Sequence, residues 1–272
     1  MKIQTWLKNA IQTLREAGID SARIDCLAIL EHQLKKPRDW LIAHSEETLN
    51  QAELTKLNKT VTQRADHIPL AYLIGSKEFY GRLFTVNNAT LIPRPESEDI
   101  ITLLLSTTSE ETNTSPVLVD IGTGSGILAI TAQLELPHST VVATDISEPA
   151  LNVAAQNAAS LKAPVQFFNA DLLALPDSVK PDIILANLPY VPDSLITSEE
   201  ITKEPSLALF SGTDGLSHYT TLWQQISLLP HKPHVVVTES LASQHQQLQN
   251  LAHNAGYTLE KTLNLAQLFI LQ

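Results

Sequence analysis

The segment Asn187-Leu188-Pro189-Tyr190 directly follows the apolar run IILA and carries groups that could hold a flat nitrogen compound. The side-chain oxygen of Asn187 and the backbone carbonyl of Leu188 could each accept one N–H hydrogen of an amide or an exocyclic amine. Tyr190 could stack on the flat group, and Pro189 would stiffen the turn. These groups suit a reaction in which such a nitrogen is oriented toward an electrophile. The alternative is a strand that ends in a capped turn.

A glycine-rich turn follows an earlier apolar run, VLVDI. Its residues are Asp120, Ile121, Gly122, Thr123, Gly124, Ser125 and Gly126. Glycines let the backbone turn sharply and approach a ligand, and the helix expected after the turn would offer free N–H groups. The spacing G-x-G-x-G differs from the dinucleotide fingerprint G-x-G-x-x-G, and the Lys-Ser/Thr pair of a phosphate-binding loop is missing. The turn by itself therefore does not identify a ligand.

Acidic residues follow the next two apolar runs. Asp145 ends TVVATD and could accept both hydroxyls of a ribose, while Asp171 and Leu172 follow VQFFNA, where an adenine ring would lie. Each acid also has an ordinary alternative, because Asp145 could cap a helix starting near Glu148 and Asp171 could cap its own turn. Ligands of open parallel sheets bind at the carboxyl ends of the strands, so we expect these residues to meet at one edge.

From residue 97 onward, apolar runs alternate with stretches of helical periodicity. The predicted strands are 117–121, 140–146, 165–168, 182–187 and 234–239, with a closing hairpin over 256–272. The predicted helices include 127–136 and 149–161, and a Ser-, Thr- and Glu-rich loop is expected over 106–115. This alternation predicts an α/β domain with a parallel sheet covered by helices on both faces.

The part before residue 97 is of a different kind. Residues 1–67 predict a bundle of four helices, with Ile24 on the apolar face of the second helix and Asn50 just before the fourth. The connector over 68–96 contains KEFYGRLFTVNNATLI, which predicts a β-hairpin that turns at Asn87-Asn88.

Composition and net charge limit the classes of function that this chain can have. The 272 residues include one cysteine, carry a formal net charge of −11, and contain no long apolar run or signal-peptide pattern. We therefore expect a cytoplasmic protein without membrane contact, and Cys26 in the core. Nucleic-acid-binding proteins usually have a basic face, so direct binding to nucleic acid is not expected. No metal is expected either, because His231 and His234 have no third ligand nearby.

The order D-x-G-x-G-x-G, followed by an acid at the end of the next strand, resembles the cofactor half of class I S-adenosylmethionine-dependent methyltransferases. The resemblance implies a Rossmann-like domain over 97–272 with seven mostly parallel strands, S-adenosyl-L-methionine as cofactor and S-adenosyl-L-homocysteine as product. The implied cofactor residues are Gly122, Thr123, Gly124, Ser125, Gly126, Asp145, Asp171, Leu172 and Asn187. The family often has an aromatic residue where this chain has Leu172.

The connector and later segments resemble bacterial peptide chain release factor glutamine methyltransferases. The matching residues are Pro69-Leu70-Ala71-Tyr72, Gly75, Glu78-Phe79-Tyr80-Gly81, Leu91 to Glu96, Glu204-Pro205, Ala208-Leu209, Gly212 to Leu216, Tyr219 and Glu239. The family usually has Pro at position 188 and Ile-Gly where this chain has Ser240-Leu241. We expect Leu188→Pro to be tolerated, because the substrate would need only the backbone carbonyl.

The resemblance implies methylation of the side-chain nitrogen N5 of the glutamine in the Gly-Gly-Gln motif of translation release factors. Asn187, Leu188, Pro189 and Tyr190 would then be the catalytic residues, and the helical bundle would help to recognise the release factor. Arg94 and Glu96 are expected to be structural, and the protein is expected to be a monomer.

Two alternatives remain open. Asn-Leu-Pro-Tyr is also the form found in ribosomal RNA adenine dimethyltransferases, so an adenine N6-methyltransferase acting on RNA or DNA is one alternative. It would need a basic groove. The other alternative is a binding module of the same fold without catalytic activity, which the departure at Leu188 raises.

Overall fold

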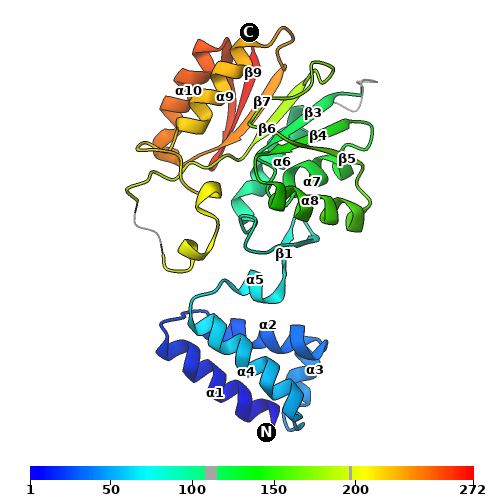
Figure 1. Cartoon of the computed structure of the whole chain (residues 1–272), viewed down its shortest axis with the longest axis vertical. Helices are drawn as coiled ribbons and strands as arrows, with labels where there is room; N and C mark the ends of the chain where they lie inside the picture. Colours follow the sequence, from blue (N-terminus) through cyan, green and yellow to red (C-terminus); the bar gives the residue numbers. More distant parts are fainter. Residues whose placement is uncertain (108–114, 196–197) are drawn as a thin grey trace. The chain divides into compact units, whose positions relative to one another are not determined.

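The computed structural model describes residues 1–107, 115–195 and 198–272. It contains two compact units, Met1–Gly75 with Thr197–Lys203, and Ser76–Ile196 with Glu204–Gln272 (Figure 1). Most of the loop expected over 106–115 lies outside the described residues. Within the described ranges, no helix combines the length and apolar character needed to cross a membrane.

The first unit is a helical bundle. Its helices are α1 (Ile3–Glu16), α2 (Ala22–Leu34), α3 (Arg38–Ala43), α4 (Gln51–Ala65) and α5 (Leu70–Ile74), and residues Ile201–Lys203 form the short 3₁₀ helix η2. Helix α4 begins after Asn50, as predicted, and Asn50 caps it: its side chain accepts from the Glu53 N–H at 2.9 Å and the Glu53 carboxylate accepts from the Asn50 N–H at 2.8 Å. Cys26 is buried, as predicted.

The predicted inward position of Ile24 is wrong. Ile24 is 61% exposed, and the neighbouring Asp25 is 3% exposed. Helix α2 is oriented so that Asp25 meets Arg64 of α4, whose Nε donates to the carboxylate at 2.7 Å. A buried carboxylate is stable only with such a partner. The hydrophobic pattern alone could not show this pairing, because the two residues are far apart in the sequence.

The second unit contains a seven-stranded sheet in the order β5-β4-β3-β6-β7-β9-β8. Its strands are β3 (Val117–Ile121), β4 (Thr140–Asp145), β5 (Val165–Asn169), β6 (Ile183–Ala186), β7 (Val235–Glu239), β8 (Tyr257–Leu263) and β9 (Ala266–Leu271). Strands β3 to β7 pair in parallel and β9 pairs antiparallel with both β7 and β8. The predicted strands and the closing hairpin are therefore confirmed, and the carboxyl ends of β3, β4 and β6 share one edge.

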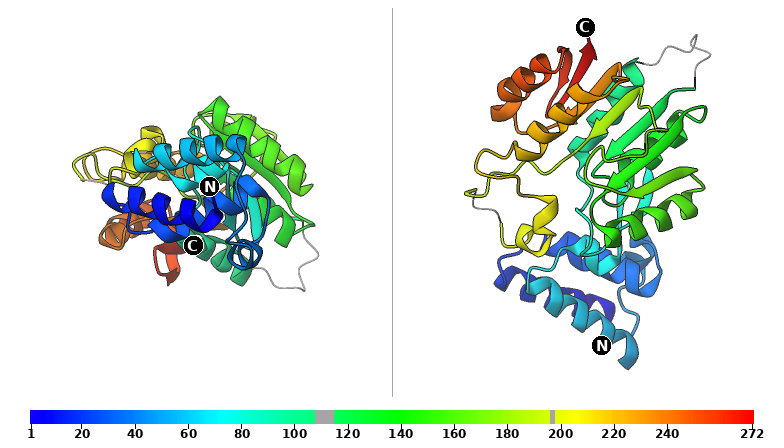
Figure 2. Two further views of the ribbon diagram at one scale, coloured as in Figure 1. Left: turned by 90° about the horizontal axis from the view of Figure 1, so that it is seen from below. Right: turned by 45° about the horizontal axis from the view of Figure 1, so that its top comes forward.

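Helices cover both faces of this sheet (Figures 1 and 2). The helices are α6 (Glu98–Thr107), α7 (Ile127–Glu135), α8 (Glu148–Leu161), α9 (Ser217–Leu228) and α10 (His245–Asn254), with short 3₁₀ helices η1 (Pro95–Ser97), η3 (Ser206–Ala208) and η4 (Ala242–Gln244). Residues of α6, α7 and α8 form one apolar core with the sheet, and residues of α9 and α10 form a second core on the other face. This is the doubly covered α/β arrangement that the apolar runs predict.

The connector hairpin turns earlier than predicted. Strands β1 (Ser76–Phe79) and β2 (Arg82–Thr85) are antiparallel and are joined by Tyr80 and Gly81, with φ of 51° and 72°. Two successive positive φ values are what a two-residue hairpin turn requires. Asn87 instead forms a separate turn, in which its side-chain oxygen accepts from the Ala89 N–H at 2.8 Å. The predicted turn at Asn87-Asn88 is therefore wrong. The true turn was missed because it requires a positive φ at Tyr80, and tyrosine seldom adopts that conformation.

Candidate active site

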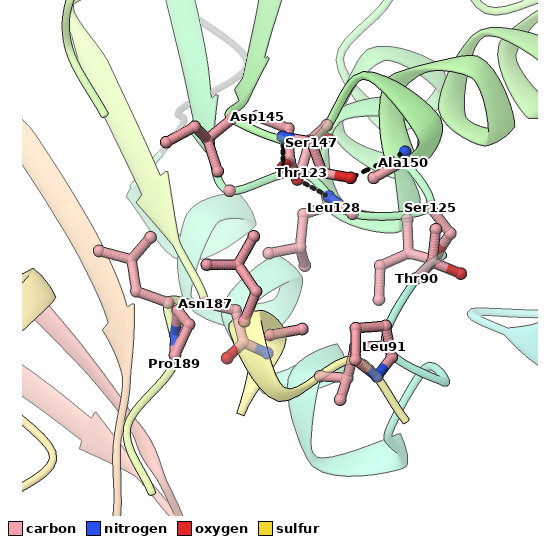
Figure 3. Close-up of a pocket in the computed structure, with 18 of the residues that line it drawn as sticks. Thr90, Leu91, Thr123, Ser125, Leu128, Asp145, Ser147, Ala150, Asn187 and Pro189 are labelled. Carbon is pink, nitrogen blue, oxygen red and sulfur yellow. Dashed lines mark hydrogen bonds between the residues drawn. The ribbon is translucent and has the colours of Figure 1, made fainter. Parts of the chain in front are cut away.

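A cavity lies at the carboxyl ends of β3, β4, β5 and β6, within the second unit (Figure 3). Its lining includes Leu91, Ile92, Pro93, Arg94, Ser97, Gly122, Thr123, Gly124, Ser125, Asp145, Ile146, Ser147, Asp171, Leu172, Asn187, Leu188, Pro189, Pro205, Leu207 and His218. All predicted cofactor residues except Gly126 are in this lining, and they come from four strand ends. Figure 3 shows Asp145 and Ser147 across the cavity from Asn187 and Pro189.

The glycine-rich turn is built for close packing at both of its ends. Gly122 has φ of 70°, and a Cβ there would lie 3.0 Å from Leu188 Cδ2. Gly126 has φ of 84°, and its Cβ would lie 2.8 Å from Ile130 Cδ1 and 3.1 Å from the Ala154 Cβ. The first glycine therefore permits contact between the turn and the Asn187 segment, and the last permits α7 to pack on α8.

Asp120 does not line the cavity, but its buried side chain holds the glycine-rich turn in place. It is 1% exposed, and its Oδ2 accepts from the Thr123 hydroxyl at 2.6 Å and from the Ala129 N–H at 3.1 Å. Burial raises the pKa of Asp120 to about 7, against the opposing effect of these two hydrogen bonds. The residue thus fixes the turn onto the start of α7.

Asp145 lines the cavity with its carboxylate held by backbone N–H groups. Oδ2 accepts from Gly124 at 2.8 Å, and Oδ1 accepts from Ser147 at 2.8 Å. Burial raises the pKa of Asp145, and these hydrogen bonds oppose the rise. The cap of α8 is Ser147, whose hydroxyl accepts from the Ala150 N–H at 3.3 Å. Each Asp145 oxygen keeps a lone pair that a ligand hydroxyl can use.

Asp171 and Leu172 lie side by side in the cavity wall. Asp171 is exposed, whereas Leu172 is 8% exposed and has φ of 51°. The Leu172 carbonyl accepts from the buried Thr144 hydroxyl at 3.0 Å, which holds this left-handed turn in place. Leu172 therefore presents an apolar surface to the cavity.

Three of the four residues in the Asn187 segment line the cavity. Asn187 Nδ2 donates to Ser97 Oγ at 2.8 Å, and the Leu188 N–H donates to the Tyr219 hydroxyl oxygen at 3.2 Å. Tyr190 is not among the lining residues, and its hydroxyl donates to Glu239 Oε1 at 2.9 Å. Asn187 and Leu188 are thus each held by a side chain, Ser97 in the cavity wall and Tyr219 outside the lining, and stacking by Tyr190 stays a prediction.

Arg94 lies in the lining and forms an ion pair with Glu204, not with Glu96. Glu204 is 6% exposed and also accepts from the Ile92 N–H at 3.0 Å. Glu96 is exposed. The Arg94–Glu204 pair therefore joins the Leu-Ile-Pro-Arg loop to the start of η3, so that two parts of the cavity wall are fastened together.

The sequence did not single out Ser97, His218 and Gln244. Ser97 receives the Asn187 amide, and His218 lines the cavity with its Nδ1 at 2.6 Å from Ser211 Oγ. Gln244 Nε2 donates to the carbonyls of Tyr190 and Asp214, both at 2.8 Å. The contacts of Ser97 and Gln244 join segments that are far apart in the sequence, whereas the His218 contact is with Ser211, seven positions earlier. The local hint for Ser97 was a short polar residue directly after Pro95-Glu96.

Among the described residues, no group of three or more His, Cys, Asp or Glu side chains could hold a metal ion. His231 Nε2 lies 3.3 Å from Asp182 Oδ1, and its ring centroid is 6.4 Å from that of His234. The two histidines are accounted for by an ordinary surface contact.

Two family models match the chain. The model described as PrmC N-terminal domain matches residues 5–75, and the Methyltransferase small domain matches residues 97–208. Among solved structures, a methyltransferase from Pyrococcus furiosus covers 81% of this chain and 98% of its own, with 15% identity and a TM-score of 0.51. The human METTL16 catalytic domain covers 81% of both chains, with 13% identity and a TM-score of 0.51. These likenesses show the class I methyltransferase fold.

Curated relatives match over most of the chain. The release factor glutamine methyltransferase of Bacillus subtilis is 37% identical over 242 residues, which cover 86% of this chain and 83% of the relative. That of Bacillus anthracis is 33% identical over 264 residues, covering 94% and 92%. A bifunctional methyltransferase of Rickettsia bellii is 30% identical over 289 residues, and the chain spans 52% of it, about half of its length. With a matching front domain, a methyltransferase fold and this similarity over nearly its whole length, the chain belongs to the release factor glutamine methyltransferase family.

Proposed function

We propose that this protein transfers a methyl group from S-adenosyl-L-methionine to the side-chain amide nitrogen N5 of a glutamine, and that the substrate is the Gly-Gly-Gln motif of translation release factors. The observation that carries the proposal is the position of two oxygen acceptors, on Asn187 and Leu188, in the wall of a cavity suited to a nucleoside. Family membership supports the identity of the protein substrate.

The cavity fits the proposed cofactor. Asp145 has free lone pairs for the two ribose hydroxyls, and Gly124 leaves open space, with nothing within 4 Å of a Cβ built there. Leu172 and Ile146 offer apolar surface for an adenine ring. When bound, the cofactor supplies an electrophilic methyl group on a positively charged sulfur. The residues proposed to hold it are Gly122 to Gly126, Asp145, Asp171, Leu172 and Asn187.

The proposed task of Asn187 and Leu188 is to orient the substrate amide. The lone pair of an amide nitrogen is delocalised toward its carbonyl, so the nitrogen must be held in a fixed direction to react. The Asn187 side-chain oxygen and the Leu188 carbonyl would each accept one N–H hydrogen. These contacts strengthen as positive charge develops on the nitrogen, which favours the transition state over the bound substrate. Pro189 and Tyr190 would complete the substrate site.

The charge distribution supports a protein substrate over a nucleic acid. The unit made of residues 76–196 and 204–272 contains 7 Lys and Arg residues and 18 Asp and Glu residues, so it carries the whole net charge of −11. A phosphate backbone would be repelled from such a surface. An adenine N6-methyltransferase acting on RNA or DNA is therefore the weaker alternative. We further propose that the protein acts as a cytoplasmic monomer.

We also propose that the helical part, residues 1–67, contributes to recognition of the release factor. None of the described residues that line the cavity belongs to it. It exposes Ile24 by 61% and Ile42 by 58%, which are available for contact with a protein. Replacing both with asparagine should raise KM for release factor and leave kcat unchanged. A raised KM for the cofactor instead would contradict this role.

The test is methyl transfer from radiolabelled S-adenosyl-L-methionine to purified release factor. Label should appear in intact release factor and be absent when the glutamine of its Gly-Gly-Gln motif is replaced with alanine. Ribosomal RNA and DNA should remain unlabelled under the same conditions. Label in RNA but not in release factor would overturn the proposal, and label in neither substrate would favour the binding-module alternative.

A further inference from the structure

The side-chain amide of Asn187 is held by Ser97, which lies in the cavity wall. Asn187 Nδ2 donates to Ser97 Oγ at 2.8 Å, and Ser97 is 1% exposed at the end of η1. The oxygen and nitrogen of an asparagine amide are nearly equal in size, so shape alone does not decide which atom faces the cavity. A serine hydroxyl does not decide it either, because it can donate or accept.

The Glu239 carboxyl group lies next to this pair and removes the ambiguity. Glu239 is 1% exposed at the end of β7, and its Oε1 accepts from the Tyr190 hydroxyl at 2.9 Å. Its Oε2 is buried and has no partner with full hydrogen-bond geometry among the described residues. Burial raises the pKa of Glu239, and hydrogen bonding from Ser97, Tyr190 and Asn187 opposes this rise. Oε2 is therefore available to the Ser97 hydroxyl.

A carboxylate can only accept hydrogens, and Ser97 has only one hydroxyl hydrogen to give. When that hydrogen points to Glu239, Ser97 presents lone pairs alone to Asn187. Asn187 must then direct its NH₂ group toward Ser97, which leaves its oxygen directed to the cavity. If the order were reversed, the Asn187 NH₂ group would face the NH₂ group of a substrate amide, and neither could accept a hydrogen from the other.

We propose that Ser97 and Glu239 are positioning residues, which fix the direction of the Asn187 side-chain amide so that its oxygen faces the substrate nitrogen. The identity of that nitrogen as a glutamine amide rests on the function proposed above. Neither residue needs to touch the reacting atoms. Their effect is to prepare an acceptor before the substrate binds, which spares the reorganisation that a freely turning amide would require.

Glu239→Gln is the first test, because it keeps the size of the side chain and adds a hydrogen-bond donor. Ser97 can then accept from Gln and donate to Asn187, so the order of donors reverses. We expect single-turnover methyl transfer at saturating substrates to slow by about tenfold or more. Cofactor affinity, measured by calorimetry, should fall far less than the rate, because Asn187 is only one of the nine residues proposed to hold the cofactor. The control is Ser139→Ala. It removes a hydroxyl that donates to the Leu136 carbonyl at 2.7 Å just before the amino end of β4, whereas the cavity lies at the carboxyl ends of the strands.

Substitutions of Ser97 separate positioning from a general loss of negative charge. Ser97→Ala should lower kcat, and Ser97→Thr should largely restore it because the hydroxyl is kept. The double variant Ser97→Ala, Glu239→Gln should be no slower than the slower single variant, because both act through the same amide. Multiplied effects in the double variant, or normal kcat in Glu239→Gln, would refute the inference.

A spectroscopic measurement keeps this test independent of the proposed substrate and of the stability of any one variant. The side-chain amide protons of Asn187, assigned by comparison with Asn187→Ala in a ¹H–¹⁵N spectrum, should exchange slowly in the wild type and in Ser97→Thr. They should exchange faster in Ser97→Ala. Equal exchange in Ser97→Ala and wild type would refute positioning, even if wild-type protein failed to methylate release factor and the proposed function itself were wrong.

Discussion

Removal of the Tyr219 hydroxyl should weaken both the fold and the substrate site. Tyr219 is fully buried, and its hydroxyl accepts from the Leu188 N–H at 3.2 Å while its hydrogen is shared between the carbonyls of Ala186, at 3.0 Å, and Glu239. The hydroxyl thereby connects the ends of β6 and β7 and fixes the backbone that carries the Leu188 carbonyl. Tyr219→Phe leaves this buried N–H without a partner.

An unpaired buried group of this kind costs about 1–3 kcal/mol in the free energy of unfolding. For a unit of this size, each kcal/mol lowers the melting temperature by about 2–4 °C. The matched control is Tyr257→Phe. It removes a buried hydroxyl that donates to the Pro233 carbonyl at 2.7 Å, just before the amino end of β7. Both variants should melt earlier in calorimetry, but only Tyr219→Phe should lower kcat for methyl transfer.

The comparison of the two variants decides the matter, since each loses one buried hydroxyl from a tyrosine. If Tyr219→Phe and Tyr257→Phe kept the same kcat at a temperature where both are folded, the Leu188 carbonyl would not depend on Tyr219. If Tyr219→Phe melted as the wild type does, the hydrogen bond to the Leu188 N–H would contribute no stability, and Tyr219 would not be what fixes this backbone segment.

Three further predictions concern neighbouring residues. Asn187→Ala should slow single-turnover methyl transfer by about a hundredfold, because one preorganised acceptor is lost, and near-normal turnover would mean that the amide is held elsewhere. Leu188→Pro, which keeps the backbone carbonyl that the substrate would need, should nevertheless lower the free energy of unfolding by about 1 kcal/mol, because proline has no N–H for Tyr219; urea unfolding measures this, and unchanged stability would contradict it. Burial raises the pKa of Asp120 from 3.8 to about 7, so the folded protein keeps a proton that the unfolded chain releases, and stability should fall as the pH rises between these values. Asp120→Asn should flatten this slope in urea unfolding without cofactor, and an unchanged slope would exclude Asp120 as its source.

The sequence predicted the strands well because each is a short apolar run buried on both faces, as the complete burial of β6 illustrates. It also placed Asp145 and Asn187 correctly at one edge, since topology alone brings the carboxyl ends of parallel strands together. The sequence-based prediction was wrong where the orientation of an element depends on a pair of side chains that are far apart in the sequence. Ile24 was placed inside because the pairing of Asp25 with Arg64 leaves no local trace.

The same limit applies to the candidate site. The sequence showed which groups could accept hydrogens from a substrate, but not what holds those groups. Ser97, 90 positions before Asn187, and Tyr219, 31 positions after Leu188, became visible only from the contacts. Supporting residues have no required spacing in the chain, because any element that reaches the strand end can supply them.

The departure at Leu188 shows what such supporting contacts can replace. The proline usual at this position would stiffen the segment through its ring but would offer no N–H. Leucine gives up the ring, and its N–H is instead held by Tyr219, while its 3%-exposed side chain packs where Gly122 leaves room. Two contacts therefore hold the residue that carries the backbone carbonyl: the hydrogen bond from the Leu188 N–H to Tyr219, and the packing of the Leu188 side chain on the glycine-rich turn. Leu188 is thus no argument for a catalytically silent protein, because rigidity that the family usually obtains from a covalent ring is here provided by packing and one hydrogen bond.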